Sequence, residues 1–263
     1  QDAATGRTPR LRGLTLVKEA RERGIPLLFA ADVIHGLSTI FPVPLAEAAA
    51  FDVELAYRTA RAAAVETAAS AVHQTYAPMV DVARDQRWGR NVEGGGEDVL
   101  LNNLLATARV RGFQGDKGLD APDAVLATAK HMAGYSAAIG GVDYNTTDMS
   151  EQTLRGVFLP PFKAAVDAGC LAIMSAFNDV NGVPASTNRE LLTAYRAAGL
   201  NHDARRAVLA QARTAPLPTA QTSSASAPHT PSRSAVVPLA ARARRPRSAP
   251  AVVAARPLPP ATR

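Results

Sequence analysis

The chain has 263 residues and a formal net charge of +6, but the charge is unevenly distributed. Residues 1–200 hold 19 Lys and Arg against 22 Asp and Glu, whereas residues 201–263 hold 10 Arg and a single Asp. Because a basic surface binds nucleic acid only where a fold displays it, this charge does not indicate a nucleic-acid-binding protein. The only cysteine, Cys170, excludes an internal disulfide and a cysteine-based metal site.

The beginning of the chain is polar and does not begin with Met, so we expect an incomplete N-terminus without a signal peptide. No apolar run approaches the ~18 residues that cross a bilayer, and we expect no membrane partner. Residues 14–23 predict an amphipathic helix that Gly24 and Pro26 terminate. Residues 25–33 then form an apolar run that predicts a buried strand ending at Asp32.

The stretch from Ala77 to Asp98 differs from the rest of the chain in composition. A long Ala-rich helix over residues 46–71 and a strand over residues 74–82 precede it. It combines acidic and basic side chains with the only Trp and a triple Gly, which is typical of a functional or salt-bridged loop. A helix over residues 97–111 is expected next, with Gly112 near its end.

Two further units follow the same pattern. Residues 123–130 predict a third strand that ends in Lys130 and His131, and residues 171–177 predict a fourth. The helix between them, residues 150–168, contains two consecutive prolines that should break or kink it. Consecutive strand–helix units predict an α/β fold with a parallel sheet, here a partial (β/α)8 TIM-type barrel with about four βα units.

The composition changes after about residue 200. Residues 201–263 contain no Gly, Lys, Glu or aromatic residue, and Ala, Pro, Arg, Ser and Thr supply 48 of the 63 positions. Such a segment cannot bury enough apolar surface to offset its ordering entropy. We therefore predict a partial barrel domain over residues 1–200 and a disordered basic tail over residues 201–263. The bias also fits a GC-rich gene translated out of frame.

Several motifs recur in the order and spacing of a known enzyme family. They are residues 29–36, residues 77–90 with Glu93 and Glu97-Asp98, Lys130-His131, and residues 174–178 with Asn181-Gly182. From about residue 25 to residue 192 the chain resembles glycoside hydrolase family 3, in particular its bacterial β-glucosidases and β-xylosidases. The resemblance implies retaining hydrolysis of terminal β-linked sugars at the carboxyl ends of the barrel strands, with no metal or organic cofactor.

The same resemblance implies which residues bind the sugar. Asp32 would accept hydrogen bonds from sugar hydroxyls, or else serve only as a salt-bridging residue. Arg90 would contact the sugar, and Lys130 and His131 would donate hydrogen bonds to neighbouring hydroxyls. Met174 would line the pocket or belong to the core. Lys130 also fits a Schiff-base lysine, although acidic neighbours would keep it protonated.

Other motif residues are expected to support the site. Trp88 would pack under its loop and orient Arg90. Glu93, Glu97 and Asp98 would support the sugar-contacting residues without touching the sugar, or their negative charge would stabilise the N-terminus of a helix.

The chain departs from the family where catalysis is concerned. Retaining hydrolysis uses two carboxyl groups about 5–5.5 Å apart. The family's nucleophile, in a Ser-Asp motif, would fall near Leu209, where the sequence has none. The acid/base residue comes from a following domain that we do not find. We therefore expect no catalytic residue to be retained and the chain as given to be inactive.

Two functions stay open at this point. The first is a glycosidase fragment whose partner is a small-molecule or oligosaccharide β-glycoside, without nucleic acid or membrane. The second is a non-catalytic carbohydrate-binding or partner-binding fragment. A periplasmic or secreted location follows from the resemblance, and a cytoplasmic one remains open.

Overall fold

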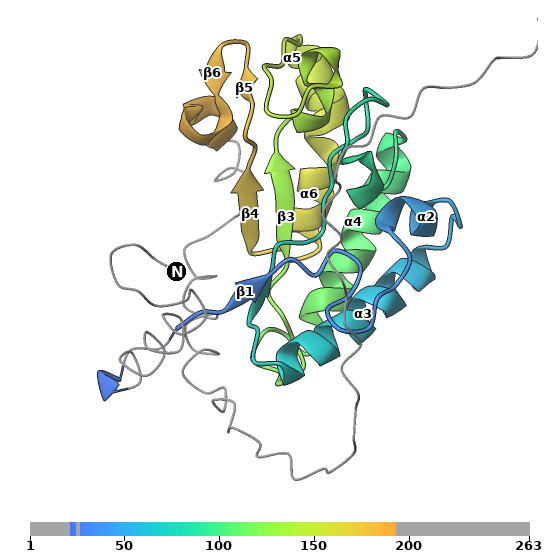
Figure 1. The fold of residues 1–263 in the computed structure, drawn as a ribbon, viewed down its shortest axis with the longest axis vertical. Helices are drawn as coiled ribbons and strands as arrows, with labels where there is room; N and C mark the ends of the chain where they lie inside the picture. Colours follow the sequence, from blue (N-terminus) through green and yellow to red (C-terminus); the bar gives the residue numbers. More distant parts are fainter. Residues whose placement is uncertain (1–21, 25–26, 193–263) are drawn as a thin grey trace, which may run out of the picture. The chain divides into compact units, whose positions relative to one another are not determined.

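The computed structural model describes residues 22–24 and 27–192 (Figure 1). Most of the predicted helix over residues 14–23 lies outside these ranges. The tail over residues 201–263, the expected nucleophile position near Leu209 and the frame change also lie outside them.

Four parallel strands follow one another in chain order. They are β1 (Ala30–Ala31), β2 (Gln74–Thr75), β3 (Thr128–Met132) and β4 (Ala172–Ser175). β1 pairs with β2, and β3 pairs with β4 with Lys130 opposite Met174. Parallel bridges between Gln74 and Leu126 and between Met79 and Lys130 connect the two pairs. The sequential order β1-β2-β3-β4 is the one expected for consecutive βα units.

The strands are shorter than the apolar runs predicted. The segment after β2 stays alongside β3, since Thr128 N donates to Ala77 O (2.8 Å) and Val80 N donates to Lys130 O (2.8 Å). Pro78 has no N–H to contribute, so regular pairing stops around it. The third strand is also displaced from its predicted range of residues 123–130. Lys130 and His131 therefore lie inside β3 rather than beyond its end.

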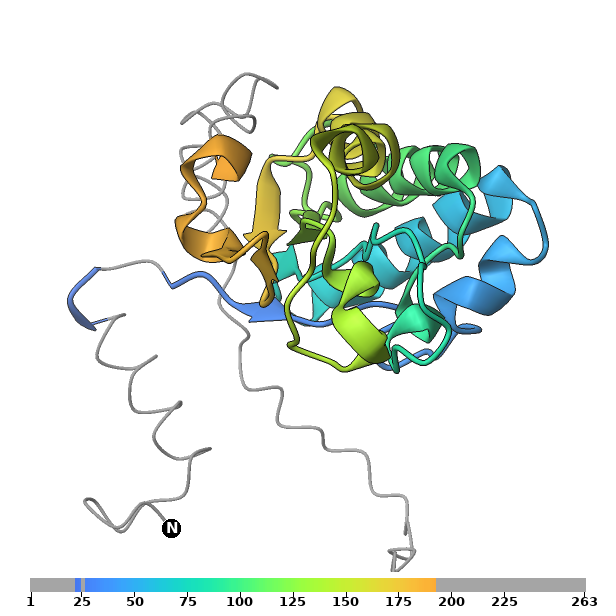
Figure 2. The same ribbon diagram turned by 90° about the horizontal axis from the view of Figure 1, so that it is seen from above.

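The helices pack along one side of the strands, as two perpendicular views show (Figures 1 and 2). They are α2 (Pro44–Ala48), α3 (Val53–Ala69), α4 (Val99–Gln114), α5 (Glu151–Thr153), a π-helical turn (Leu154–Phe158) and α6 (Pro160–Asp167). Short 3-10 turns occupy Asn91–Glu93, Tyr135–Ala137, Ile139–Gly141 and Ala185–Thr187, and β5 (Asp179–Val180) forms an antiparallel hairpin with β6 (Val183–Pro184). Every described helix is too short or too polar to span a bilayer.

Two helix predictions need correction. The single helix predicted over residues 46–71 is two helices, because Phe51 adopts a φ of 52° and the Asp52 carboxylate caps α3 by accepting from Leu55 N (3.0 Å). The helix predicted to end near Gly112 instead continues to Gln114. The predicted break at the two prolines is confirmed, since α6 starts at Pro160, where a proline fits the first helical turn.

The main core fills the space between strands and helices. Its buried members include Val33, Val80, Val110, Phe113 and Phe162. The apolar strand segments and the apolar faces of the helices that alternate along the sequence supply this core. It holds the carboxyl ends of β1 and β3 at fixed positions.

Gly112 sits where α4 crosses α3 at close range. A Cβ at this position would lie 2.6 Å from the Ala60 Cβ and 2.7 Å from the Tyr57 carbonyl oxygen. The second contact is with backbone, so it cannot be relieved by a side-chain rotation. Gly112 therefore permits the helix packing, which explains a glycine inside a helix.

We predict that Gly112→Ala lowers the free energy of unfolding by about 1–3 kcal/mol through overpacking. Gly156→Ala is the matched control, because a Cβ there meets nothing within 4 Å. Chemical denaturation of both variants measures the effect. Equal midpoints for the two variants would contradict this account of the α3–α4 contact.

His73 joins the segment before β1 to the start of β2. Its Nδ1 accepts a hydrogen bond from Phe29 N (3.1 Å), and its backbone N donates to Phe29 O (2.8 Å). Burial lowers the pKa of His73. Protonation would also remove the acceptor that Phe29 N uses.

Stability is therefore predicted to fall on acidification below the ordinary His pKa of ~6.5. In that range the unfolded chain binds a proton that folded His73 does not, so unfolding is favoured as the pH drops. His73→Gln keeps an acceptor without titrating. Denaturation midpoints between about pH 7 and pH 5 should decline less in this variant. An identical decline in both proteins would assign the effect to another group.

Candidate functional site

Lys130 is a buried ammonium group in β3. Its side chain is 3% exposed, and its Nζ lies 2.7 Å from Asp32 Oδ1 and 3.9 Å from Glu93 Oε2. Asp32 directly follows β1, and its side chain is 58% exposed. A buried cation is costly unless paired, so these two carboxylates account for the position of Lys130. Asp32 thereby presents a carboxylate that is both paired and accessible.

Arg90 joins the same network through Glu93. Its Nε and Nη2 donate to the two Glu93 carboxylate oxygens at 2.8 and 2.9 Å, which is the bidentate geometry of a strong ion pair. Burial alone would lower the pKa of Arg90, but the Glu93 carboxylate raises it. Glu93 thus binds both cations, a larger role than the supporting one expected for it. The structure brings Asp32, Lys130, Glu93 and Arg90 into one continuous array.

His131 is held in place by Asp81. Its Nδ1 lies 2.9 Å from Asp81 Oδ2, and its backbone N donates to the same oxygen at 3.1 Å. Both side chains are 1% exposed. Asp81 lies in the segment after β2, where the sequence predicted only an apolar strand.

Met174 is the register partner of Lys130 in β4. Register partners in neighbouring strands project toward the same face of a sheet. Met174 is partly buried, so it lies beside the Lys130 position rather than in the deep core. Of the predicted residues, Asp32, Arg90 and Lys130 are thus linked by contacts, while His131 and Met174 adjoin Lys130 through β3 and its pairing with β4.

An aromatic cluster supports this array. The Arg90 guanidinium lies 5.7 Å from the Tyr135 ring centre, a cation–π distance, and the Trp88 and Tyr135 rings meet edge to face at 5.1 Å. Trp88 Nε1 donates to Asp143 Oδ1 (2.9 Å). Burial and the nearby Asp143 carboxylate raise the pKa of Tyr135. Trp88 therefore reaches Arg90 through Tyr135, and its predicted packing under the loop is observed as 1% exposure.

The loop that follows Asp32 is held by contacts with α4 and α3. Arg109 in α4 donates to Ile34 O (3.2 Å) and pairs with Glu47 in α2, both of them buried. Glu66 in α3 accepts from the backbone N–H groups of Ser38 (3.1 Å) and Thr39 (2.9 Å). These contacts fix the start of the loop relative to β3, and thereby the Asp32 carboxylate relative to Lys130.

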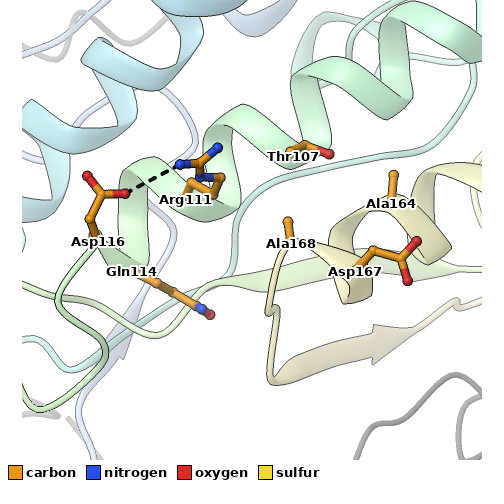
Figure 3. A pocket seen from close by; sticks show the side chains of 8 residues that line it. Thr107, Arg111, Gln114, Asp116, Ala164, Asp167 and Ala168 are labelled. Carbon is orange, nitrogen blue, oxygen red and sulfur yellow. Dashed lines mark ion pairs between the residues drawn. The ribbon is translucent and has the colours of Figure 1, made fainter.

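A separate surface hollow lies between α4 and α6 (Figure 3). Its lining comprises Thr107, Arg111, Gln114, Gly115, Asp116, Ala164, Asp167 and Ala168, with Arg111 and Asp116 paired at 3.7 Å. The helices run opposite to the strands, so their carboxyl ends lie at the beginnings of β3 and β4. None of the predicted site residues lines this hollow. In barrel enzymes the chemistry is found at the other end of the strands.

Within the described part of the chain, no group of three or more His, Cys, Asp and Glu side chains is arranged to hold a metal ion. Cys170 is buried, and burial raises the pKa of its thiol to about 11, so it is not a nucleophile at neutral pH.

Amide substitutions of the two carboxylates around Lys130 should have unequal effects on stability. Glu93 serves two cations and is largely buried, so Glu93→Gln is expected to cost about 1–3 kcal/mol. Asp32 is exposed, and after its substitution Lys130 still has the Glu93 carboxylate nearby. Asp32→Asn is therefore expected to cost less than about 1 kcal/mol. Urea denaturation of both variants tests this order. A larger cost for Asp32→Asn would show that Asp32 alone stabilises Lys130.

The sequence of the chain is similar to those of known glycoside hydrolases. The sequence profile of the glycosyl hydrolase family 3 N-terminal domain matches residues 7–203. The periplasmic β-glucosidase of Salmonella typhimurium is 45% identical over 168 residues, covering 64% of this chain and 22% of that protein. A putative β-xylosidase of Formosa agariphila is 38% identical over 176 residues, covering 65% of this chain and 23% of that protein.

Solved structures give the same result. The crystal structure of the β-glucosidase from Listeria innocua in complex with glucose matches with a TM-score of 0.66 and 42% identity, over 69% of this chain and 26% of that one. The chain thus spans about a quarter of the relatives it matches. The matched domain has a TIM-barrel-like α/β fold, in agreement with the four parallel strands and their covering helices. The chain belongs to glycoside hydrolase family 3, of which it contains N-terminal domain sequence.

Proposed function

We propose that the described residues form the sugar-binding face of a retaining family 3 glycosidase that acts on terminal β-linked glucosides or xylosides. The observation that carries this proposal is the array in which buried Lys130 connects the exposed carboxylate of Asp32 to the Glu93–Arg90 pair. Alternating charged acceptors and donors suit a polyhydroxylated ligand, because each hydroxyl can both donate and accept.

The proposed arrangement is four βα units of a (β/α)8 barrel, with the site at the carboxyl ends of its strands. Asp32 would accept from a pair of sugar hydroxyls, while Lys130 and Arg90 would donate. A sugar that lacks one of these hydroxyls would leave a charged group unpaired, and this gives strong discrimination. Met174 would form the apolar side of the pocket. The similarity to the periplasmic β-glucosidase of Salmonella typhimurium supports a periplasmic location.

A non-catalytic sugar-binding role for the chain as given is the second candidate. It is favoured by the sequence near Leu209, which has no Ser-Asp motif, while the array around Lys130 is complete. The chain would then bind a β-glycoside without hydrolysing it, because neither carboxylate of the retaining pair can be assigned. Asp143, which accepts a hydrogen bond from Trp88, and Asp148 would be the first residues to examine if turnover were found.

The test is calorimetric titration of the 263-residue chain with glucose and with xylose. Lys130→Met removes the charged donor with little change in volume, and we expect it to weaken binding at least about tenfold, since a hydrogen bond to a charged group contributes about 1.5–3 kcal/mol. Lys163→Met is the matched control, because Lys163 lies on the outside of α6 and pairs with Asp167. Unchanged affinity in Lys130→Met would refute the proposed site.

Hydrolysis separates the two candidate functions in the same samples. We expect no release of aryl alcohol from an aryl β-glucoside above background. Turnover that disappears on substitution of an acid within the chain would favour the enzyme over the binding protein.

A further inference from the structure

The Asp81–His131 pair has a geometry that determines which imidazole nitrogen carries the proton. A single oxygen, Asp81 Oδ2, lies 2.9 Å from His131 Nδ1 and 3.1 Å from the His131 backbone N. The backbone N–H can only donate, so this oxygen is acting as an acceptor there. With Asp81 ionised, its carboxylate is an acceptor only, and the proton of the second contact then resides on Nδ1.

The pair is shielded from solvent, which keeps this arrangement in place. Both side chains are 1% exposed, and the other Asp81 oxygen, Oδ1, is buried without a partner among the described residues. The His131 ring is bounded by the edge of Tyr135 at 5.2 Å and by Phe177 at 5.5 Å. These neighbours restrict rotation of the ring, so a flip that would exchange Nδ1 and Nε2 is disfavoured.

Nε2, the second ring nitrogen of His131, is then the atom available to a ligand. In a neutral imidazole with the proton on Nδ1, Nε2 carries a lone pair and accepts hydrogen bonds. Among the described residues, Nδ1 is the only ring nitrogen of His131 with a hydrogen-bond partner. His131 also directly follows Lys130, whose ammonium group is a donor.

We infer that Asp81 is a positioning residue that holds His131 as the neutral Nδ1–H tautomer, so that Nε2 accepts a hydrogen bond from a sugar hydroxyl. This inference rests on the proposed function for its ligand, a β-linked sugar. It reverses the donor role expected for His131 from the sequence. The site then combines two acceptors, Asp32 and His131, with two donors, Lys130 and Arg90, and a hydroxyl facing His131 must donate.

The tautomer can be measured without any ligand. Nitrogen-15 NMR of the full chain labelled at histidine distinguishes a protonated from an unprotonated ring nitrogen for each residue. We expect His131 to show a protonated Nδ1 and an unprotonated Nε2 at neutral pH. Two protonated nitrogens, or a proton on Nε2 alone, would overturn the assignment.

A sugar series then tests the direction of the hydrogen bond. Glucose should shift the His131 Nε2 resonance. A monodeoxyfluoro-glucose with fluorine in place of the contacted hydroxyl should not, because fluorine cannot donate a hydrogen bond. That derivative should also bind at least about tenfold more weakly. If all monodeoxyfluoro derivatives shift Nε2 as glucose does, the acceptor role is wrong. If glucose itself does not bind, the proposed function fails, while the tautomer measurement still decides the assignment to Asp81.

Substitution of Asp81 links the tautomer to its cause. Asp81→Asn can donate to Nδ1 through its amide, so we expect a larger fraction of the Nε2–H tautomer and weaker glucose binding. Asp52→Asn is the matched control, because Asn caps a helix as well as Asp does. An unchanged tautomer in Asp81→Asn would remove Asp81 from this role. Where that variant does not fold, the measurements on the unsubstituted chain decide.

Discussion

The burial of the Lys130 ammonium group is the constraint on which this site depends. At 3% exposure the group has lost its hydration, and only nearby carboxylates can compensate. Asp32 and Glu93 supply them from two different segments, one directly after β1 and one in the loop that follows β2. The protein must therefore bring these segments together at β3 whenever it folds. Sugar binding would use charges whose positions are already required for stability.

The rest of the described structure serves this arrangement. The parallel pairing of the strands brings their carboxyl ends to one edge of the sheet. Gly112 lets α4 pack closely against α3 in the helical layer beside the strands. Arg109 and Glu66 then hold the loop after β1 from behind. Because these supports are rigid helices rather than loops, the carboxylate of Asp32 is positioned before any ligand binds. Such preorganisation reduces the cost of binding.

Much of the fold could be predicted from the sequence, because each βα unit leaves a local pattern. Apolar runs identified all four strands, and motif spacing identified the family and the residues that meet around Lys130. The exact ends of the strands and helices were harder to predict. Pro78 interrupts pairing within an apolar run, and Phe51 and Asp52 divide a helix whose composition is continuous. Gly112 suggested a helix end but marks a helix crossing.

The residues that sequence reasoning missed act over long distances in the chain. Asp81 lies in an apolar run, and its partner His131 is 50 positions away. Asp143 stood out in the sequence as an acid in a Gly-rich loop, but its hydrogen bond with Trp88, 55 positions away, was not predicted. Glu93 was noticed, but its contact with Lys130 depends on how the loop folds back over β3. An acidic residue within an apolar strand was the one available indication, since a buried carboxylate requires a partner.

The most direct test of the central claim is a crystal structure of the 263-residue chain grown with glucose. The account predicts glucose at the carboxyl ends of the strands, with one hydroxyl donating to the Asp32 carboxylate and another accepting from Lys130 Nζ. Glucose bound only elsewhere, for example in the hollow between α4 and α6, with Asp32 and Lys130 free of it, would contradict the account.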